Sequence, residues 1–534
     1  TAGKRRWDYE LLRIIPAILT APSRDNADAI LVQWIDTLGP IDACTGCASL
    51  SPAGLKLQPD LAWINDTATL GVPLSHRLQS IYSNRVRNQQ YYVSLGSGAG
   101  NPRFNHESAY GSLQFPDPGY QILALFRLWN IVEYWAPNRD VVGENWNDVL
   151  TKFIPRVALA QDKDSYVRAM LALIAEIHDT HANLWSSLNL RPPLGACRLP
   201  VNVRFVGRAA IITGYTSADP GNASGLQRGD EIAAIDGVPV SQLVKQWTPR
   251  YADSNDAARL RDMAATLTNG NCGPVKIDVR RNAVSTTVAA SRLSYSQAGS
   301  PAFTHDLLGP TFRLLSKDIA YLKLSSVKIA DVPGYIDQAQ GTKALIVDIR
   351  NYPSEYVVFA LGSFLVRQPT PFAEFSLADL SNPGAFHLGP TEMLTPVGHS
   401  YDGRVVVLVD EASQSQAEYT AMALRATPHA IVVGSTTAGA DGDVSEIFLP
   451  GGLRTMISGL GVFYPDGQPT QRIGIHIDVE AHPTIAGLSA GRDEVLETAI
   501  HQILPSLPPS EVEKLVRSSP ADTSPKQKAA SIPR

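Results

Sequence analysis

Two serines lie where an expected buried strand passes into an expected helix, and either can do nucleophilic chemistry. The apolar run 405–409 predicts the strand, and apolar residues of 417–424 fall near one helical face. Ser413 and Ser415 stand between these segments. A helix N-terminus offers unpaired backbone N–H groups that stabilise the oxyanion formed when a serine attacks a carbonyl. The alternative is that a serine only caps the helix, and this stretch alone favours the cap.

A serine nucleophile needs a base, and a turn with two histidines offers one. Residues 165–178 are apolar at helical spacing and run into the sequence HDTHANLW. His178 and His181 therefore lie where a helix breaks into a polar turn. Taken alone, this turn favours a structural role for the histidines over a catalytic one.

Composition and charge narrow the classes of protein that remain. A chain of 534 residues is long enough for three or four domains. Its net charge of −5 provides no basic field for nucleic acid or anionic lipid. No apolar run approaches the ~20 residues that span a bilayer. The sequence starts TAGKRR without a signal peptide, which fits either a cytoplasmic protein or a mature exported one.

The four cysteines do not settle the compartment alone, but their even number, the low lysine content and the many prolines together favour an exported, periplasmic or secreted protein. Cys44 and Cys47 form a C-x-x-C, which suits a redox pair, half a zinc site or a small disulfide. A zinc site needs a second close pair, but Cys197 and Cys272 are far apart in the sequence. We therefore expect a structural disulfide in preference to a metal site.

The chain divides into five expected parts, which together predict a multidomain α/β protein. Residues 1–112 read as an irregular N-terminal domain, and 113–195 as a segment of three amphipathic helices. Residues 198–293 are rich in strand patterns. Residues 306–507 alternate buried strands with helices, so ligands are expected beyond the strand C-termini. Residues 508–534 read as a disordered tail.

The strand-rich part, residues 198–293, carries a motif of its own. Residues 223–240, ASGLQRGDEIAAIDGVPV, are similar to the core of PDZ domains, with a turn signal at Asp236–Gly237. The resemblance implies a PDZ-like domain, a class that binds extended peptide termini by adding a strand to a sheet edge. The carboxylate-binding loop of that class is not recognisable near residues 205–207. A spacing or gating role is therefore an equal alternative.

Several motifs in order resemble the C-terminal processing (tail-specific) family of serine peptidases. ALIVDIRN at 344–351 is similar to its strand ending in D-L-R. VVLVDEASQSQAE at 406–418 resembles its nucleophile motif, in which serine lies three residues before glutamate, and that rule selects Ser415 over Ser413. Segments 432–439, 473–479 and 491–496 resemble the family's later motifs. The resemblance implies an α/β catalytic domain with Ser415 as nucleophile.

The general base expected here differs from that of the bacterial members of the family, which use a Ser–Lys dyad. Their lysine lies in a G-K-G loop, but the sequence here is AGADG at 438–442, without lysine. The branch similar to tricorn protease uses a histidine placed before the PDZ domain. Thr180–His181 match that placement, so the resemblance assigns His181 as general base and Thr180 as a hydroxyl relay. His178 is the competing base.

The resemblance points to Gln471 as the group that orients the histidine, because a glutamate stands there in the tricorn-like branch. Glutamine can fix the tautomer but cannot stabilise imidazolium by charge. Asp179, Asp441 and Glu418 are alternative carboxylates, and the sequence does not choose among them.

The oxyanion would be held by backbone N–H groups. The family resemblance assigns the residue after the nucleophile, Gln416, and the loop after residue 350. In that loop NYPSE replaces the usual Gly-Gly pair; Pro353 cannot donate, so Ser354 or Glu355 must.

The expected function is therefore that of a serine peptidase acting on unfolded or short peptides through an acyl-enzyme. The resemblance implies no metal and no organic cofactor, and a homo-oligomer is possible. Two alternatives stay open: an inactive peptide-binding PDZ protein, and a Ser/His hydrolase of a non-peptide acyl substrate.

Overall fold

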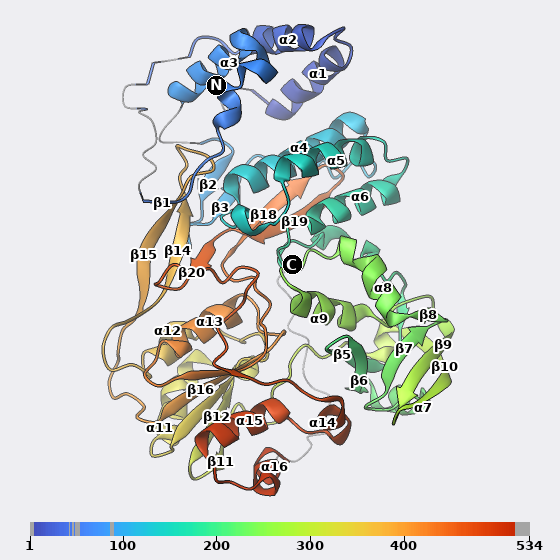
Figure 1. Ribbon diagram of the computed structural model, residues 1–534, viewed down its shortest axis with the longest axis vertical. Helices are drawn as coiled ribbons and strands as arrows, with labels where there is room; N and C mark the ends of the chain where they lie inside the picture. The colour runs from blue at the N-terminus through green and yellow to red at the C-terminus, as the bar shows by residue number, and fades with distance from the viewer. Residues whose placement is uncertain (1–4, 42, 45–46, 48–53, 86–89, 518–534) are drawn as a thin grey trace.

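The computed structural model describes residues 5–41, 43, 44, 47, 54–85 and 90–517 (Figure 1). The helices of the N-terminal region form one end of the molecule in Figure 1, a helical layer follows, and a parallel sheet and a β-rich unit lie side by side at the other end. The mixed α/β class expected from the sequence is confirmed.

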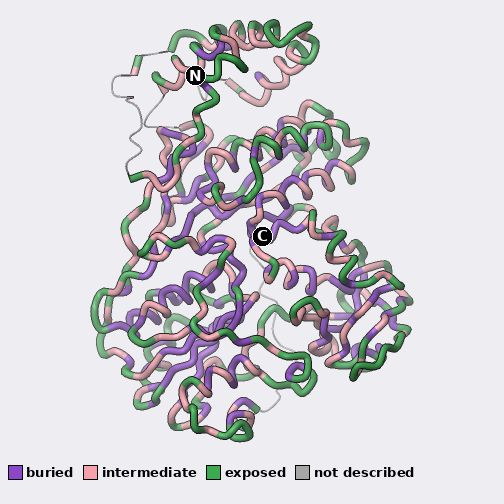
Figure 2. The backbone as a smooth tube through the Cα atoms, in the orientation of Figure 1, coloured by how far each residue is buried: buried purple, intermediate pink, exposed green. Residues whose placement is uncertain are grey.

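A six-stranded sheet forms the largest core, in the order β11-β12-β13-β16-β17-β21. All its neighbouring strands are parallel except β11 and β12. The central strands are buried on both faces, as their continuous apolar sequences predict (Figure 2). The bounds are β11 Phe312–Ser316, β12 Ile319–Lys323, β13 Ala344–Asp348, β16 Arg404–Val409, β17 Ile431–Gly434 and β21 Val479–Glu480.

Helices cover both faces of this sheet. Alternate strand residues point to opposite sides, so Val405 and Val407 join one core while Val406 and Leu408 join the other. The first core holds α11 (Val332–Ala339), α12 (Val358–Gly362) and α13 (Gln416–Arg425). The second holds α15 (Glu494–Ile503) and α16 (Pro509–Arg517).

The expectation of a disordered tail from residue 508 is wrong for its first part. The chain continues as α16, in which Val512 and Val516 are buried against the sheet. The four-residue spacing of these valines places both on one helical face, a signal that the surrounding Pro and Ser content obscures. The rest of that tail lies outside the described residues.

A seven-stranded sheet makes up the β-rich unit, in the order β4-β10-β9-β7-β6-β5, with β8 beside β7. Its edge strand β5 lies along helix α9 (Asp256–Thr266). The strands are β4 Cys197–Arg198, β5 Val201–Val206, β6 Ala209–Tyr215, β7 Glu231–Ile235, β8 Val238–Pro239, β9 Gly273–Arg281 and β10 Val284–Ser294, with short helices α7 Ala218–Ala223, α8 Val240–Trp247 and α10 Tyr295–Ala298.

The helical layer is built from α4 (Pro118–Trp135), α5 (Trp146–Ala158) and α6 (Lys163–Ala175), as the apolar periodicity predicts. It packs on a hairpin of β18 (Val444–Leu449) and β19 (Leu453–Ser458), whose Ile447 and Ile457 are fully buried among the helices. A hairpin from the expected catalytic unit therefore completes the core of the helical segment.

The N-terminal region is not irregular, which corrects the sequence-based expectation. It holds α1 (Trp7–Leu19), α2 (Arg24–Asp36) and α3 (Thr67–Ser83). Ser23 and Asp66 cap the last two through their side chains, while prolines inside α1 and α3 weaken the helical sequence signal. Three short strands follow in the first 112 residues: β1 Leu55–Leu57, β2 Val93–Leu95 and β3 Pro102–Phe104. Further elements of the C-terminal half are β14 Thr370–Ala378, β15 Phe386–Leu394, β20 Gly461–Phe463 and α14 Ile485–Ala490.

Strand β1 ties the N-terminal region to the rest of the molecule, because it pairs with β15 in a sheet of order β1-β15-β14-β20.

The cysteines form two disulfides. Cys44 pairs with Cys47, which confirms the expected disulfide. Cys197 pairs with Cys272 across a sequence separation of 75, a pairing that spacing did not indicate.

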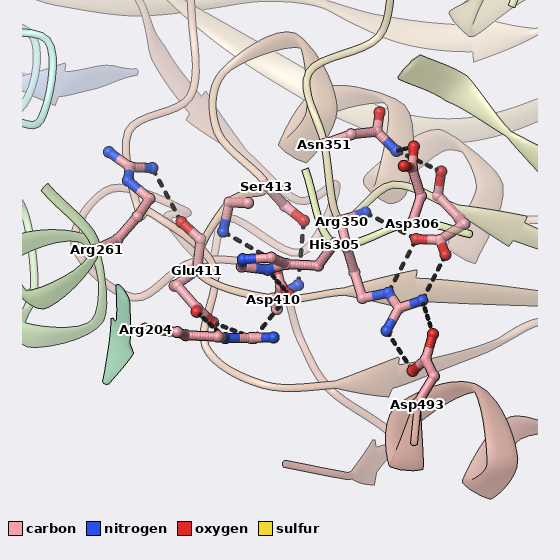
Figure 3. Close-up of polar contacts among 12 residues, drawn as sticks. Arg204, Arg261, His305, Asp306, Arg350, Asn351, Asp410, Glu411, Ser413 and Asp493 are labelled. Carbon is pink, nitrogen blue, oxygen red and sulfur yellow. Dashed lines mark hydrogen bonds and ion pairs between the residues drawn. The ribbon is translucent and has the colours of Figure 1, made fainter. Parts of the chain in front are cut away.

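A buried ion network fastens α15 to the end of β13 (Figure 3). Arg350 is bidentate to Asp348, at 3.0 and 2.6 Å, and contacts both carboxylate oxygens of Asp493, each at 2.7 Å. Asp348 is fully buried, so it depends on this guanidinium for its charge balance.

We expect Arg350→Met to lower the free energy of unfolding by about 3–5 kcal/mol, because it leaves Asp348 buried without its cation. Urea unfolding followed by tryptophan fluorescence measures the change. Asp493→Asn is the matched control, since Asp493 is more exposed and the Arg350–Asp348 pair survives. Equal losses in the two variants would contradict the dependence of Asp348 on Arg350.

Candidate active site

Ser415 lies in a strained turn between β16 and α13. Its φ of 56° and ψ of −120° are unusual for a residue with a side chain. Such strain persists only where the surroundings enforce it, and it is concentrated at active sites. Here the Ser415 N–H donates to the Ala440 carbonyl at 3.0 Å and to the Glu418 carboxylate at 3.2 Å. The side chain is half-buried at the first turn of the helix.

Ser413 differs from Ser415 in every one of these respects. It is fully buried, and its hydroxyl donates to the Ile349 carbonyl at 2.6 Å while accepting the Asp410 N–H at 3.2 Å. The Ser413 hydroxyl therefore joins the ends of β13 and β16 and has no room for a substrate.

His181 is held in the turn after α6 by a relay to a carboxylate. Its Nδ1 lies 2.9 Å from the Ser458 hydroxyl, which lies 3.0 Å from Asp179 Oδ1. Asp179 also accepts the N–H groups of His181 and Ser458, at 3.0 and 2.5 Å. A carboxylate only accepts, so the Ser458 hydroxyl donates to Asp179 and accepts from Nδ1–H. This tautomer leaves Nε2 with a free lone pair.

The environment of His181 favours the neutral imidazole. Burial lowers the pKa of His181, and the negative charges of Asp179 and Asp443 oppose that shift. A neutral ring near pH 7 is what a general base requires.

Thr180 connects the histidine turn to the loop that holds Ser415. Its hydroxyl lies 3.1 Å from the Ser254 hydroxyl and 3.3 Å from the Ala438 carbonyl. Ala440, two residues along the same loop, accepts the Ser415 N–H. The loop 435–443 thus contacts both Ser415 and Thr180. The hydroxyl of Thr180 bonds to this loop and not to the His181 ring.

Gln471 is buried next to the same loop, since the neighbouring Arg472 N–H donates to the Gly439 carbonyl at 2.8 Å. Within the described residues Gln471 makes no hydrogen bond to His181. The structure brings Asp179 and Ser458 to the ring instead. The sequence offers Asp179 among three candidate carboxylates, but nothing in it indicates Ser458, which lies 277 positions from His181 and carries no local motif.

His178 occupies a different environment. It has a φ of 52°, and among described residues its buried Nδ1 has no hydrogen-bond partner. Burial, with Arg472 and Arg259 nearby, lowers the pKa of His178 to about 4. The neutral side chain therefore fills a packed site without the relay that holds His181.

The loop after β13 lies against the start of α13. The side chain of Gln416 donates to the Glu355 carbonyl at 2.8 Å, which keeps this loop beside the residue that follows Ser415. The Ser354 N–H already donates to the Leu324 carbonyl at 2.9 Å. Ser354 is therefore not a free oxyanion donor, which corrects that part of the expectation and leaves Glu355 in the loop.

One described cluster has the composition of a metal site: His305, Asp410 and Glu411 (Figure 3). Arg204 from β5 already binds both carboxylates, at 2.9 Å to Asp410 and 2.7 Å to Glu411. His305 Nδ1 lies 2.6 Å from Asp410. A metal ion would have to displace the guanidinium, so this donor set fits an interdomain ion pair and not a cation site.

Parts of this chain are similar to known peptidases. Residues 318–481 match the model of peptidase family S41. The carboxyl-terminal-processing protease of Synechocystis sp. (strain ATCC 27184 / PCC 6803 / Kazusa) is 24% identical over 336 residues, which cover 59% of this chain and 70% of that protein.

Two solved structures share the fold. The crystal structure of mature CPAF has a TM-score of 0.58 at 13% identity and covers 76% of this chain and 98% of its own. The complex of mature CPAF with lactacystin has a TM-score of 0.56 at 14% identity, with 75% and 99% covered.

The parallel sheet with its strand–serine–helix turn is thus that of a serine-type peptidase. Residues 318–481 carry the domain of peptidase family S41, and the chain is similar to a C-terminal processing (tail-specific) peptidase of that kind. Within the described residues, none of the helices has the length and apolar character needed to cross a bilayer.

Proposed function

We propose that this protein cleaves peptide bonds with a Ser415–His181 pair, in the manner of the tricorn-like branch of its family. The observation that carries the proposal is the relay behind His181. The Ser458 hydroxyl, 2.9 Å from Nδ1, and Asp179, 3.0 Å from that hydroxyl, leave Nε2 unprotonated. A base in this state is the partner that a serine hydroxyl needs.

The proposed reaction follows from these roles. His181 Nε2 takes the proton of the Ser415 hydroxyl as its oxygen attacks the scissile carbonyl, and then passes that proton to the leaving amine. Water hydrolyses the acyl-enzyme with His181 again as base. Asp179 supplies the charge that stabilises imidazolium, which Gln471 cannot do. The backbone N–H groups of Gln416 and Glu355 are the proposed oxyanion donors.

Substrates are proposed to be unfolded or short peptides, because other parts of the chain surround the site. The unit 198–293 is proposed to be PDZ-like. Its edge strand β5 and helix α9 line a groove of about 190 Å³ that also contacts Ala412 and Ser435 of the catalytic unit. An extended peptide can pair with such a free edge. Gating of the site by this unit is the alternative to terminus recognition.

The two disulfides support an exported protein, in the periplasm or outside the cell. We propose this location because such bonds persist in oxidising compartments.

Labelling by a fluorophosphonate probe tests the proposal, together with hydrolysis of a peptide library and of p-nitrophenyl esters. A peptidase labels and cleaves peptides. A protein that neither labels nor cleaves would be the peptide-binding alternative, which the substituted Gly-Gly loop favours. Ester cleavage without any peptide cleavage would identify the hydrolase of another acyl substrate.

The relay makes a prediction for the pH profile. Asp179→Asn removes the charge that raises the pKa of His181, so that pKa falls further and the acid limb of kcat/KM moves to lower pH. The plateau falls by roughly 10²- to 10⁴-fold, because imidazolium loses its stabilising charge.

Stopped assays of peptide hydrolysis between pH 4 and about 9 measure both effects. Ser458→Ala is the matched variant, since it breaks the relay and keeps the carboxylate. An acid limb that stays at its wild-type pH in Asp179→Asn would refute the relay.

A further inference from the structure

The loop 435–443 holds a buried carboxyl group that the proposed mechanism does not use. Asp441 is 2% exposed, and its Oδ1 accepts the Gly442 N–H at 2.7 Å. Its Oδ2 is buried and, among described residues, has no hydrogen-bond partner. An ionised carboxylate is costly in such a place, because both of its oxygens need donors or a cation.

A second buried carboxyl group, that of Glu418, lies beside Asp441 and accepts more hydrogen bonds than Asp441 does. It is fully buried, but it accepts from the Thr437 hydroxyl at 2.5 Å and from the N–H groups of Gly439, Ala440 and Ser415 at 2.8, 3.0 and 3.2 Å. Four donors stabilise a negative charge on Glu418, whereas Asp441 has one. If the pair carries one charge, Glu418 holds it and Asp441 holds the proton.

The other ionisable groups that face Asp441 bring no positive charge. They are tyrosines from three neighbouring elements: Tyr419 on α13, Tyr352 and Tyr356 in the loop after β13, and Tyr464 after β20. Within the described residues, the groups that act on Asp441 include no lysine, arginine or histidine. Burial, and then the charge of Glu418, raise the pKa of Asp441 well above its usual range.

The same loop connects the two halves of the candidate site. The Ala440 carbonyl accepts the Ser415 N–H, and the Ala438 carbonyl accepts from Thr180 next to His181. The Ala438 N–H donates to the Ser413 carbonyl at 2.9 Å. A displacement of Asp441 therefore changes the backbone that sets the strained conformation of Ser415.

We propose that Asp441 is a positioning residue that stays protonated in the working enzyme, sharing one negative charge with Glu418 and so keeping the loop 435–443 closed against Ser415 and Thr180. The proposal rests on the Ser415–His181 site proposed above. Loss of the Asp441 proton at high pH places two anions side by side in a buried site, and their repulsion releases the loop. Activity then falls on the alkaline side while the charge state of His181 stays unchanged.

Infrared spectroscopy tests the protonation directly. The difference spectrum of wild type minus Asp441→Asn at pH 7 is expected to contain the C=O band of a protonated carboxylic acid. This band should disappear on raising the pH with the midpoint of the alkaline limb of kcat/KM. Asparagine is a neutral isostere of the protonated acid, so Asp441→Asn should keep kcat/KM within a few-fold at pH 7 and lose that limb.

Glu446→Gln is the matched control, because it neutralises an exposed carboxylate on the adjoining strand β18. It should retain both the band and the alkaline limb. Absence of the band at pH 7, or an alkaline limb unchanged in Asp441→Asn, overturns the proposal. If Asp441→Asn fails to fold, Asp441→Ser replaces it in the difference spectrum, because the carboxyl groups of Asp253 and Glu107 also have pKa values raised by burial to about 7 and contribute to the wild-type band. A band present in a protein that hydrolyses no peptide supports the protonated Asp441 and refutes the proposed function, so the two failures are distinguishable.

Discussion

Ser415→Ala is expected to abolish fluorophosphonate labelling and to lower kcat/KM for peptides by about 10⁶-fold, the scale of loss when the nucleophile of a serine peptidase is removed. The reason is chemical, because alanine has no oxygen to form the acyl-enzyme. Its strained backbone, with φ of 56°, is less favourable for alanine than for glycine, so thermal unfolding is measured in parallel. Ser415→Gly gives the same chemical loss without that strain.

Ser413→Ala is the matched control for this experiment. It removes a buried hydroxyl that bonds to the Ile349 carbonyl and to the Asp410 N–H, so stability falls by roughly 1–3 kcal/mol. Labelling persists, because the Ser413 hydroxyl has no part in the reaction. Labelling that survives in Ser415→Ala, or is lost only in Ser413→Ala, would refute the assignment of the nucleophile.

His181→Ala is expected to produce the second large loss, between about 10³- and 10⁶-fold in kcat/KM, because Ser415 then has no base. The effect lies in kcat more than in KM, since the ring acts on a proton and not on substrate binding. Single-turnover labelling with the fluorophosphonate probe follows the acylation step and should slow by a similar factor.

His178→Ala provides the comparison. The pKa of His178 is about 4 and its environment is that of a packed neutral side chain, so activity at pH 7 should remain within a few-fold of wild type. Equal losses in the two variants would refute His181 as the base. The pH profile adds a second check, because activity should be present at neutral pH and fall as acid protonates His181, whose pKa is lowered by burial.

Local sequence patterns were enough to predict the position of the candidate nucleophile. An apolar strand followed by a short polar turn and an amphipathic helix indicated where a nucleophile would lie, and the serine–glutamate spacing selected Ser415. The glutamate of that motif accepts the Ser415 N–H, which gives a physical reason for the spacing. These assignments are the proposals that the variants above test.

The group behind His181 could not be chosen from the sequence. Asp179 was one of several candidate carboxylates, and Ser458 belongs to a strand that carries no motif. Their contact joins positions 279 apart, so it exists only once the hairpin of β18 and β19 packs on the helical layer. Similarly, the hydrogen bond from the Ser354 N–H to the Leu324 carbonyl forms only because the loop after β13 packs against the end of β12.

By itself, the sequence determined the order of the units, the buried parallel strands and the residue types that carry out the chemistry, because periodicity and turn chemistry act over a few residues. Only the tertiary structure decided which carboxylate lies behind His181, that the Ser413 hydroxyl is used inside the fold, and that, among the described residues, the Oδ2 atom of Asp441 has no hydrogen-bond partner. Burial and hydrogen-bond partners are set by segments far apart in the chain, and they decide whether a serine, histidine or aspartate is a structural or a reacting group.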